Sequence, residues 1–302
     1  MKIDDIKDIK IEYRDKLDIN PRTTIGIEIE FEKAKLKDIR KKFKQHLNGN
    51  WTAVYDGSVS DSFLDVIKGG EINSPILTNR MYEWGELETV CEILKDEGAE
   101  ITEDCGGHIH IGKQILKYES YINLIKLWFM YEPIIFRFSY GEFNRERILM
   151  NKYAYPLRLN LWNILENEER FDYSVKIVQY LSQNRNLCIN FQNLLAAKKT
   201  FEFRCPNSSL DPVIWQNNVN FFAHLLDKCN NLKIDNDKLK YIMKNFPNIP
   251  NDYIKIDLKE AEALANTIFD NEIDKLYFLR QYVKDGNDEK PKVFARSMKF
   301  TK

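Results

Sequence analysis

Strict alternation of apolar and polar residues predicts a strand near the N-terminus. In the segment TIGIEIEF (residues 24–31), three isoleucines and a phenylalanine fall on one face of an extended chain. Gly26, Glu28 and Glu30 fall on the other face. The apolar face is suited to packing under helices, and the opposite face carries two carboxylates about 7 Å apart.

Two later segments repeat this alternation. HIHIG (108–112) places His108 and His110 opposite two isoleucines, and FEFR (201–204) places Glu202 and Arg204 opposite two phenylalanines. If the three strands share one sheet, their ionisable side chains converge on one face.

The remaining pattern mixes helices with short strands. Helical spacing predicts helices over 36–47, 81–97, 119–139, 171–182, 211–230, 236–244, 258–268 and 271–284, and strands are expected at 51–55, 70–76, 107–112, 187–192 and 200–204. The regular strand–helix rhythm and the Gly-rich phosphate turn of a nucleotide-binding parallel sheet are missing. We therefore expect an α+β fold with a mainly antiparallel sheet.

Composition and charge are those of an ordinary soluble globular protein. The 302 residues are 43% hydrophobic, with 45 basic and 46 acidic side chains, so net charge gives no reason to expect nucleic acid. The Lys-rich run 35–44 reads as a solvated helix face. The longest apolar stretch, 124–138, is interrupted by charges and predicts a buried helix, not a membrane span.

Cysteine usage and the N-terminus favour a reducing cytoplasm. The five cysteines are odd in number and follow no CxxC spacing, and the first residues, MKIDDIKDIK, lack an apolar signal core. No linker or low-complexity block divides the chain, so one catalytic body is the default. Cys105 and Cys205, beside the alternating segments, are expected to fill space and not to act as nucleophiles.

The polar face of the expected sheet has two explanations. A half-solvated antiparallel sheet alternates in this way by default. The residue types, however, are glutamate, histidine and arginine, and neighbouring carboxylates repel one another unless they share a cation. Mg²⁺ or Mn²⁺, which take mainly oxygen ligands and tolerate an imidazole, would relieve that repulsion, whereas zinc would prefer more histidine or cysteine ligands.

Four separated motifs, in this order, resemble the amidoligase family of carboxylate–amine ligases, which is related to glutamine synthetase and glutamate–cysteine ligase. They are GIEIEF, the pair W...D.S and GGEINSP, CGGHIHIG, and TFEFR, and they span residues 26–204. The resemblance implies a glutamine-synthetase-like curved antiparallel sheet with helices on one face and a concave active-site face on the other. We expect a catalytic domain over 21–235, preceded by a tail or short helix at 1–20 and followed by a helical extension at 236–302 packed on the same domain.

The resemblance also implies roles for individual residues. Glu28, Glu30, Glu71, His108 and Glu202 match metal positions for two or more Mg²⁺ or Mn²⁺ ions. Asp56 and Glu71 match acidic positions on the amine side, although Asp56 taken alone is more often a turn residue. His110 matches a position on the nucleotide side and Arg204 the arginine that faces the transferred phosphoryl group, which makes Arg204 both catalytic and ATP-binding. Arg185 is a further candidate for ATP.

The sequence departs from the family pattern after TFEFR, where CPNSSLD replaces the expected glycine–threonine turn. Arg145, Arg147 and Arg158 lie in a loop-like stretch and either bind phosphate or a carboxylate or are surface residues. His46 and His224 are expected to be structural.

Together these features predict an ATP-dependent ligase that joins a carboxylate to an amine through an acyl phosphate. The acceptor is a small amino compound, a peptide or a cell-wall component, and neither nucleic acid nor membrane is an expected partner. The substrates and the oligomeric state stay open. Two alternatives remain: a metal-dependent hydrolase using His108, His110 and the carboxylates, and a catalytically silent sheet protein that binds a partner.

Overall fold

An antiparallel sheet of seven strands forms the centre of the fold in the computed structural model, which describes residues 2–63, 66–143, 150–158, 161, 173–245 and 256–284. Its order is β2-β4-β1-β5-β7-β6, and β3 pairs with β4 beside this path. The strands are β1 (Ile25–Lys35), β2 (Thr52–Val54), β3 (Asp61–Phe63), β4 (Val66–Asn73), β5 (Gly107–Gly112), β6 (Ile189–Asn190) and β7 (Thr200–Phe203). The sheet is open, with β2 and β6 at its two ends, and the expected mixed fold with an antiparallel sheet is confirmed.

Strand register places the ionisable residues of four neighbouring strands, β4, β1, β5 and β7, on one face. Glu28 on β1 lies opposite His108 on β5, and Glu30 lies opposite Glu71 on β4. On the far side of β5, His110 lies opposite Glu202 on β7. Directly opposed residues of antiparallel strands share a face, so one face of the sheet gathers these side chains.

The opposite face is apolar and buried. Six residues from the apolar faces of the three alternating segments are at most 1% exposed, as expected for a face packed under helices: Ile27, Ile29, Ile109, Ile111, Phe201 and Phe203. Helices α4 (Tyr121–Ser139) and α9 (Pro212–Cys229) supply aromatic rings to this core. The Phe203 ring stacks on Phe222 of α9 at 4.0 Å between centroids and on Trp128 of α4 at 6.0 Å.

A glycine allows α9 to approach the sheet closely. A β-carbon at Gly107, the first residue of β5, would collide with the ring of Trp215 on α9. Trp215 is itself fully buried, and its Nε1 donates to the carbonyl oxygen of Ser209 at 2.9 Å. Gly107 therefore sets the distance between α9 and the strand that carries both histidines.

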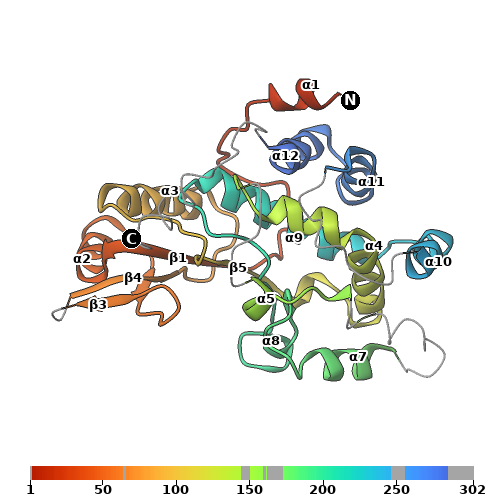
Figure 1. The fold of residues 1–302 in the computed structure, drawn as a ribbon, viewed down its shortest axis with the longest axis horizontal. Helices are drawn as coiled ribbons and strands as arrows, with labels where there is room; N and C mark the ends of the chain where they lie inside the picture. The colour runs from red at the N-terminus through yellow and green to blue at the C-terminus, as the bar shows by residue number, and fades with distance from the viewer. Residues whose placement is uncertain are drawn as a thin grey trace, which may run out of the picture.

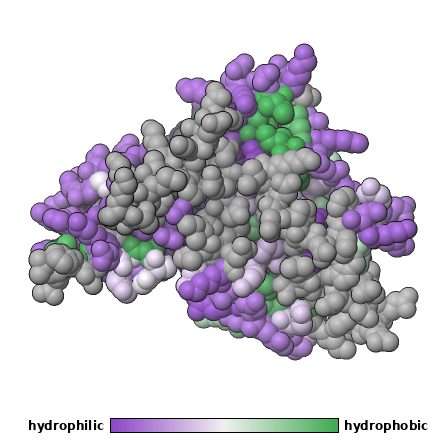
Figure 2. Space-filling model, in the orientation of Figure 1, coloured by the Kyte–Doolittle hydropathy of each residue, from purple (hydrophilic) through white to green (hydrophobic). Residues whose placement is uncertain are grey.

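Helices α2 (Leu36–His46) and α3 (Met81–Asp96) lie beside the β1–β4 side of the sheet (Figure 1). α2 buries Leu36, Ile39 and Phe43, and its surface is hydrophilic in Figure 2, so the Lys-rich run is a solvated helix face as predicted. On the other side of α9, Figure 1 shows α5 (Met150–Tyr153), α7 (Tyr173–Leu181) and α8 (Gln192–Leu195). Short 3-10 helices at Lys113–Ile115 and Tyr118–Ser120 lead from β5 into α4.

The C-terminal helices pack against α4 and α9. They are α10 (Asn236–Asn245), α11 (Leu258–Ile268) and α12 (Glu272–Val283), and α12 also contacts the N-terminal helix α1 (Ile3–Lys7). The Arg137 side chain on α4 donates to the carbonyl oxygens of Tyr282 and Val283 at 3.0 and 3.2 Å. The division of the chain into domains stays a prediction. In the described part of the chain, no helix has the length and apolar character needed to span a bilayer.

Two strands show where the sequence pattern failed. The strand expected at 187–192 is limited to Ile189–Asn190, because the Asn190 side-chain oxygen accepts from the Gln192 amide at 2.9 Å and begins the turn into α8. β3 was not expected, since its three residues are too few to show a period.

Candidate functional site

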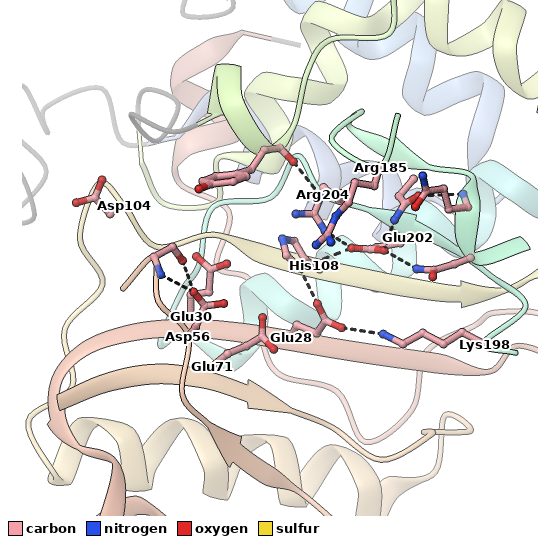
Figure 3. A pocket seen from close by; sticks show the side chains of 15 residues that line it. Glu28, Glu30, Asp56, Glu71, Asp104, His108, Arg185, Lys198, Glu202 and Arg204 are labelled. Carbon is pink, nitrogen blue, oxygen red and sulfur yellow. Dashed lines mark hydrogen bonds and ion pairs between the residues drawn. The ribbon is translucent and has the colours of Figure 1, made fainter. Parts of the chain in front are cut away.

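A cavity of about 540 Å³ lies over the ionisable face of the sheet (Figure 3). Five ionisable side chains of the three alternating segments line it, Glu28, Glu30, His108, Glu202 and Arg204, and Glu71 of β4 lines it with them. Asp56 and the exposed Arg185 line it too. His110 instead lines a neighbouring cavity of about 250 Å³, and Glu28 and Lys198 contribute to both cavities.

Glu28 is the electrostatic centre of the site. Its Oε2 lies 2.6 Å from Nδ1 of His108, and its Oε1 lies 2.9 Å from Nε2 of His110 and 3.4 Å from the Lys198 ammonium. Burial, the largest single influence, raises the pKa of Glu28, but the hydrogen bonds and charge of the two histidines outweigh it. The pKa of Glu28 therefore lies far below its usual value, and the side chain stays ionised.

Glu202 and Arg204 form the opposite wall of the cavity. Arg204 pairs with Oε1 of Glu202, while Oε2 accepts from Asn190 Nδ2 at 2.8 Å and also from Asn193. Arg204 Nε donates to the Tyr153 carbonyl oxygen at 2.9 Å, which aims the guanidinium. Although burial raises the pKa of Glu202, the nearby histidine and arginine charges lower it below its usual value.

Glu71 shows the opposite behaviour. Burial, followed by the negative charges of Glu28, Glu30 and Asp56, raises the pKa of Glu71 to about 8, although Asn73 Nδ2 donates to its Oε1 at 2.8 Å. A carboxyl group in this position holds a proton at neutral pH unless positive charge is brought to it. The two halves of the cavity thus differ: burial together with acidic neighbours raises the pKa of Glu71, whereas positive neighbours lower the pKa of Glu202 in spite of its burial.

Three groups of side chains have ligand atoms close enough together to hold a cation. They are Glu28, Glu71 and His108; Glu30, Asp56 and Glu71; and Glu28, His110 and Glu202, with all ligand atoms of a group within 4.8 Å of one another. Nε2 of His108 is buried and has no hydrogen-bond partner in the described part of the chain. An unpartnered buried nitrogen beside repelling carboxylates is what a Mg²⁺ or Mn²⁺ site would satisfy, so the residues fit such an ion.

Asp56 combines a turn with a place in the cavity. Its Oδ1 accepts from the backbone N–H and the hydroxyl of Ser58, at 2.7 and 2.5 Å. The same side chain is close enough to Glu30 and Glu71 to share an ion. The turn role and the ligand role suggested by the sequence are therefore compatible.

The other sequence candidates lie outside the site or outside the described residues. Arg158 is neither a ligand-binding nor a surface residue: it is 5% exposed, and its Nε donates to the Phe129 carbonyl oxygen at 2.9 Å. Arg145 and Arg147 lie outside the described residues. Burial raises the pKa of the Cys105 thiol to about 12, which argues against a nucleophilic role.

The CPNSSLD segment that departs from the family pattern packs against the sheet. The Pro206 carbonyl oxygen accepts from the Gly107 amide at 3.0 Å, and the Ser208 hydroxyl donates to the Glu30 carbonyl oxygen at 2.7 Å. The segment thus holds the start of β5 beside β1, close to Glu30.

Sequence reasoning missed several residues that line the cavity: Ser58, Asp104, Tyr153, Asn190, Gln192, Asn193 and Lys198. Asn190 could have been found, because it lies directly opposite Glu202 once β6 and β7 are paired. Lys198 carries no sequence signal beyond its closeness to TFEFR, and Asp104 lies in a loop without a period.

The chain was compared with known protein families and with curated proteins. A family model described as "Putative amidoligase enzyme" matches residues 21–226, which include every motif strand of the site. No curated protein matches the chain. Because the family match covers more than half of the sequence and contains the whole ionisable face of the sheet, the chain belongs to this amidoligase family.

Proposed function

We propose that the protein is an ATP-dependent ligase that forms an amide between a carboxylate and an amine through an acyl phosphate. The observation that carries this proposal is the placement of Arg204 in one cavity with His108 and with carboxylates close enough together to hold a cation. Family membership supports ligase chemistry. The glutamine-synthetase-like curvature of the sheet is part of the proposal.

In the proposed reaction, a carboxylate oxygen of the acid attacks the terminal phosphorus of ATP, and ADP leaves. The amine then attacks the carbonyl carbon of the acyl phosphate, and inorganic phosphate leaves with the electron pair of the broken C–O bond. The guanidinium of Arg204 would bind the migrating phosphoryl group, and Arg185 would add positive charge on the same side. Asp56 and Glu71, on the acidic side, would bind the ammonium form of the amine, and they would accept its proton once bound cations had displaced the proton that Glu71 holds at neutral pH.

Glu28, Glu71 and His108, together with Glu30 and Asp56, would hold the Mg²⁺ or Mn²⁺ ions, and Glu202 would complete the set. Such ions neutralise phosphate oxygens and so favour transfer between anions. The second cavity supports a nucleotide site because it joins the first at Glu28 and Lys198. Its walls include Pro75 and the exposed side chain of Ile76, which suit the flat face of a base.

A metal-dependent hydrolase is not favoured. That alternative uses His110 as a ligand beside His108, and an ion there would have to replace one of the two partners that the His110 ring nitrogens have within the protein. Nε2 lies 2.9 Å from Glu28 and Nδ1 lies 3.1 Å from the Thr200 hydroxyl. A hydrolase would also leave the cavity-lining Arg204 without a phosphoryl group to bind.

Hydroxylamine provides the test, since it is a small nucleophile that intercepts an acyl phosphate. The purified protein is incubated with ATP, Mg²⁺, hydroxylamine and a panel of amino acids, dicarboxylates and short peptides. We expect a hydroxamate together with stoichiometric ADP and phosphate for at least one acid, and thermal stabilisation of the protein by Mg²⁺ with ATP. Hydroxamate formed equally without ATP, or bond cleavage driven by metal alone, would overturn the ligase proposal.

A further inference from the structure

Lys198 occupies a distinctive place in the site. It lies in the loop between α8 and β7, and its side chain is 60% exposed. Its ammonium lies 3.4 Å from Oε1 of Glu28 (Figure 3). Among the residues that line the two cavities, only Glu28 and Lys198 belong to both, so this ion pair stands at their junction.

The two partners of this pair differ in freedom. Glu28 is on the central strand, 14% exposed, and bonded to His108 and His110. Lys198 holds Glu28 only through the end of a long, solvated side chain, and a lysine ammonium can move several ångströms at little energetic cost. The lysine can therefore leave the carboxylate, whereas the carboxylate cannot leave the site.

A divalent cation and Lys198 would compete for the same carboxylate. Glu28 belongs to two of the three groups that could hold an ion, including the group with Glu71 and His108. A bound divalent cation and the lysine ammonium would repel each other across Glu28. One of the two must move, and the lysine is the mobile partner.

We propose that Lys198 is a resident counter-ion of Glu28 that gives way to the divalent cation and then binds the phosphate chain of the nucleotide at the junction of the two cavities. The first step concerns the metal alone, and the second rests on the proposed function. Displacing Lys198 from Glu28 leaves its positive charge at the point where a nucleotide lying across both cavities would pass. Metal binding and nucleotide binding would be coupled through one side chain in this way.

The first step is tested by titrating the protein with Mn²⁺ in a calorimeter without nucleotide. Lys198→Met removes the competing charge, so Mn²⁺ should bind about three- to tenfold more tightly than to the wild-type protein. Lys198→Arg keeps a positive charge and should resemble the wild-type protein. Lys199→Met is the matched control. It removes the same charge from the next residue, whose side chain lines neither cavity.

Equal or weaker Mn²⁺ binding by Lys198→Met, or equal tightening by Lys199→Met, would overturn the counter-ion role.

The second step is tested with a non-hydrolysable ATP analogue and saturating Mg²⁺. Lys198→Met should weaken analogue binding about tenfold, while Lys199→Met leaves it unchanged. Unchanged binding by Lys198→Met would overturn the second step. A wild-type protein that binds no analogue would contradict the proposed function and leave the Mn²⁺ result valid.

Discussion

Two regions of this protein each combine a glutamate with an arginine, but in different surroundings. Glu202 and Arg204 line the large cavity, whereas Glu132 is fully buried and Arg158 is 5% exposed between α4 and the segment at 154–158. In each pair the arginine Nε donates to a backbone carbonyl oxygen 2.9 Å away. The pairs differ in what the carboxylates do.

The oxygens of Glu132 are occupied by donors of the protein itself. They accept from Trp128 Nε1 at 2.9 Å, from the Leu157 amide at 2.7 Å and from the Arg158 amide at 3.1 Å. Burial, opposed by the charge of Arg158, raises the pKa of Glu132 to about 7. The pKa of Glu202 is lowered instead, because positive groups surround it at the cavity wall.

This comparison separates a structural pair from a candidate functional one. Glu132 fixes a chain segment to α4 and needs no ligand. Glu202 keeps its negative charge and holds Arg204 where a ligand can reach the guanidinium. Equivalent substitutions in the two pairs should therefore change different measured quantities.

The largest expected effect is on catalysis by Arg204→Lys. Lysine keeps one positive charge but loses the planar fork, so ATP-dependent hydroxamate formation should fall about 10²–10³-fold. The free energy of unfolding should fall by about 1 kcal/mol, since lysine can still donate to Glu202 and the main loss is the hydrogen bond to the Tyr153 carbonyl oxygen. The matched variant Arg158→Lys should keep the rate per folded molecule and lose stability. Full activity of Arg204→Lys would remove the distinction between the two pairs.

The next effect is on stability, and it comes from Glu132→Ala. This change leaves three donors and the Arg158 charge without their acceptor, so the free energy of unfolding should fall by about 3–5 kcal/mol. Urea unfolding monitored by tryptophan fluorescence measures the loss. Glu132→Gln keeps one acceptor oxygen and should cost less. Mn²⁺ affinity of the folded protein should not change in either variant, and a clear change would show that the two regions are coupled.

The sequence showed which residues share a face of each strand, but not the order of the strands in the sheet. Alternation is a local property with a period of two, so it placed Glu28, His108 and Glu202 on the polar faces of their strands. The family resemblance, and not the period, brought these strands together before the structure was known. The prediction for Arg158, a ligand-binding or surface residue, was wrong because its burial depends on carbonyl groups of α4 that are distant in sequence. Lys198 was missed because it lies in a loop, where no periodic pattern indicates which way a side chain points.

A third test uses pH to distinguish Glu71 from the well-neutralised carboxylates. The pKa of Glu71 is raised to about 8 from an ordinary value of 4.5, so the folded protein holds a proton that the unfolded chain releases. Stability from this proton is complete below pH 4.5 and is lost as pH rises toward 8, by about 2 kcal/mol after allowing for partial exposure. Chemical unfolding of the metal-free protein at pH 5 and pH 8 measures it.

Glu71→Gln is the matched variant for the pH test. Glutamine does not titrate, so the variant should lose about 2 kcal/mol less than the wild-type protein between pH 5 and pH 8. Mn²⁺ binding to the wild-type protein should strengthen over the same interval, because the ion displaces the proton of Glu71. Parallel stability profiles for the two proteins would show that burial and the neighbouring carboxylates do not raise the pKa of Glu71.

The smallest effect is expected from Asp56→Asn, because Asp56 combines a structural role in a turn with a place among the candidate cation ligands. Its Oδ1 is occupied by the amide and hydroxyl of Ser58, as in a structural site, and asparagine retains that acceptor. Only the negative charge is lost, so thermal stability should stay unchanged and Mn²⁺ affinity should fall about threefold. Asp56→Ala also removes the turn bonds and should lower stability by about 1 kcal/mol. Unchanged metal affinity in Asp56→Asn, with lower stability only in Asp56→Ala, would assign Asp56 to the turn alone and leave Glu30 and Glu71 to bind cations without it.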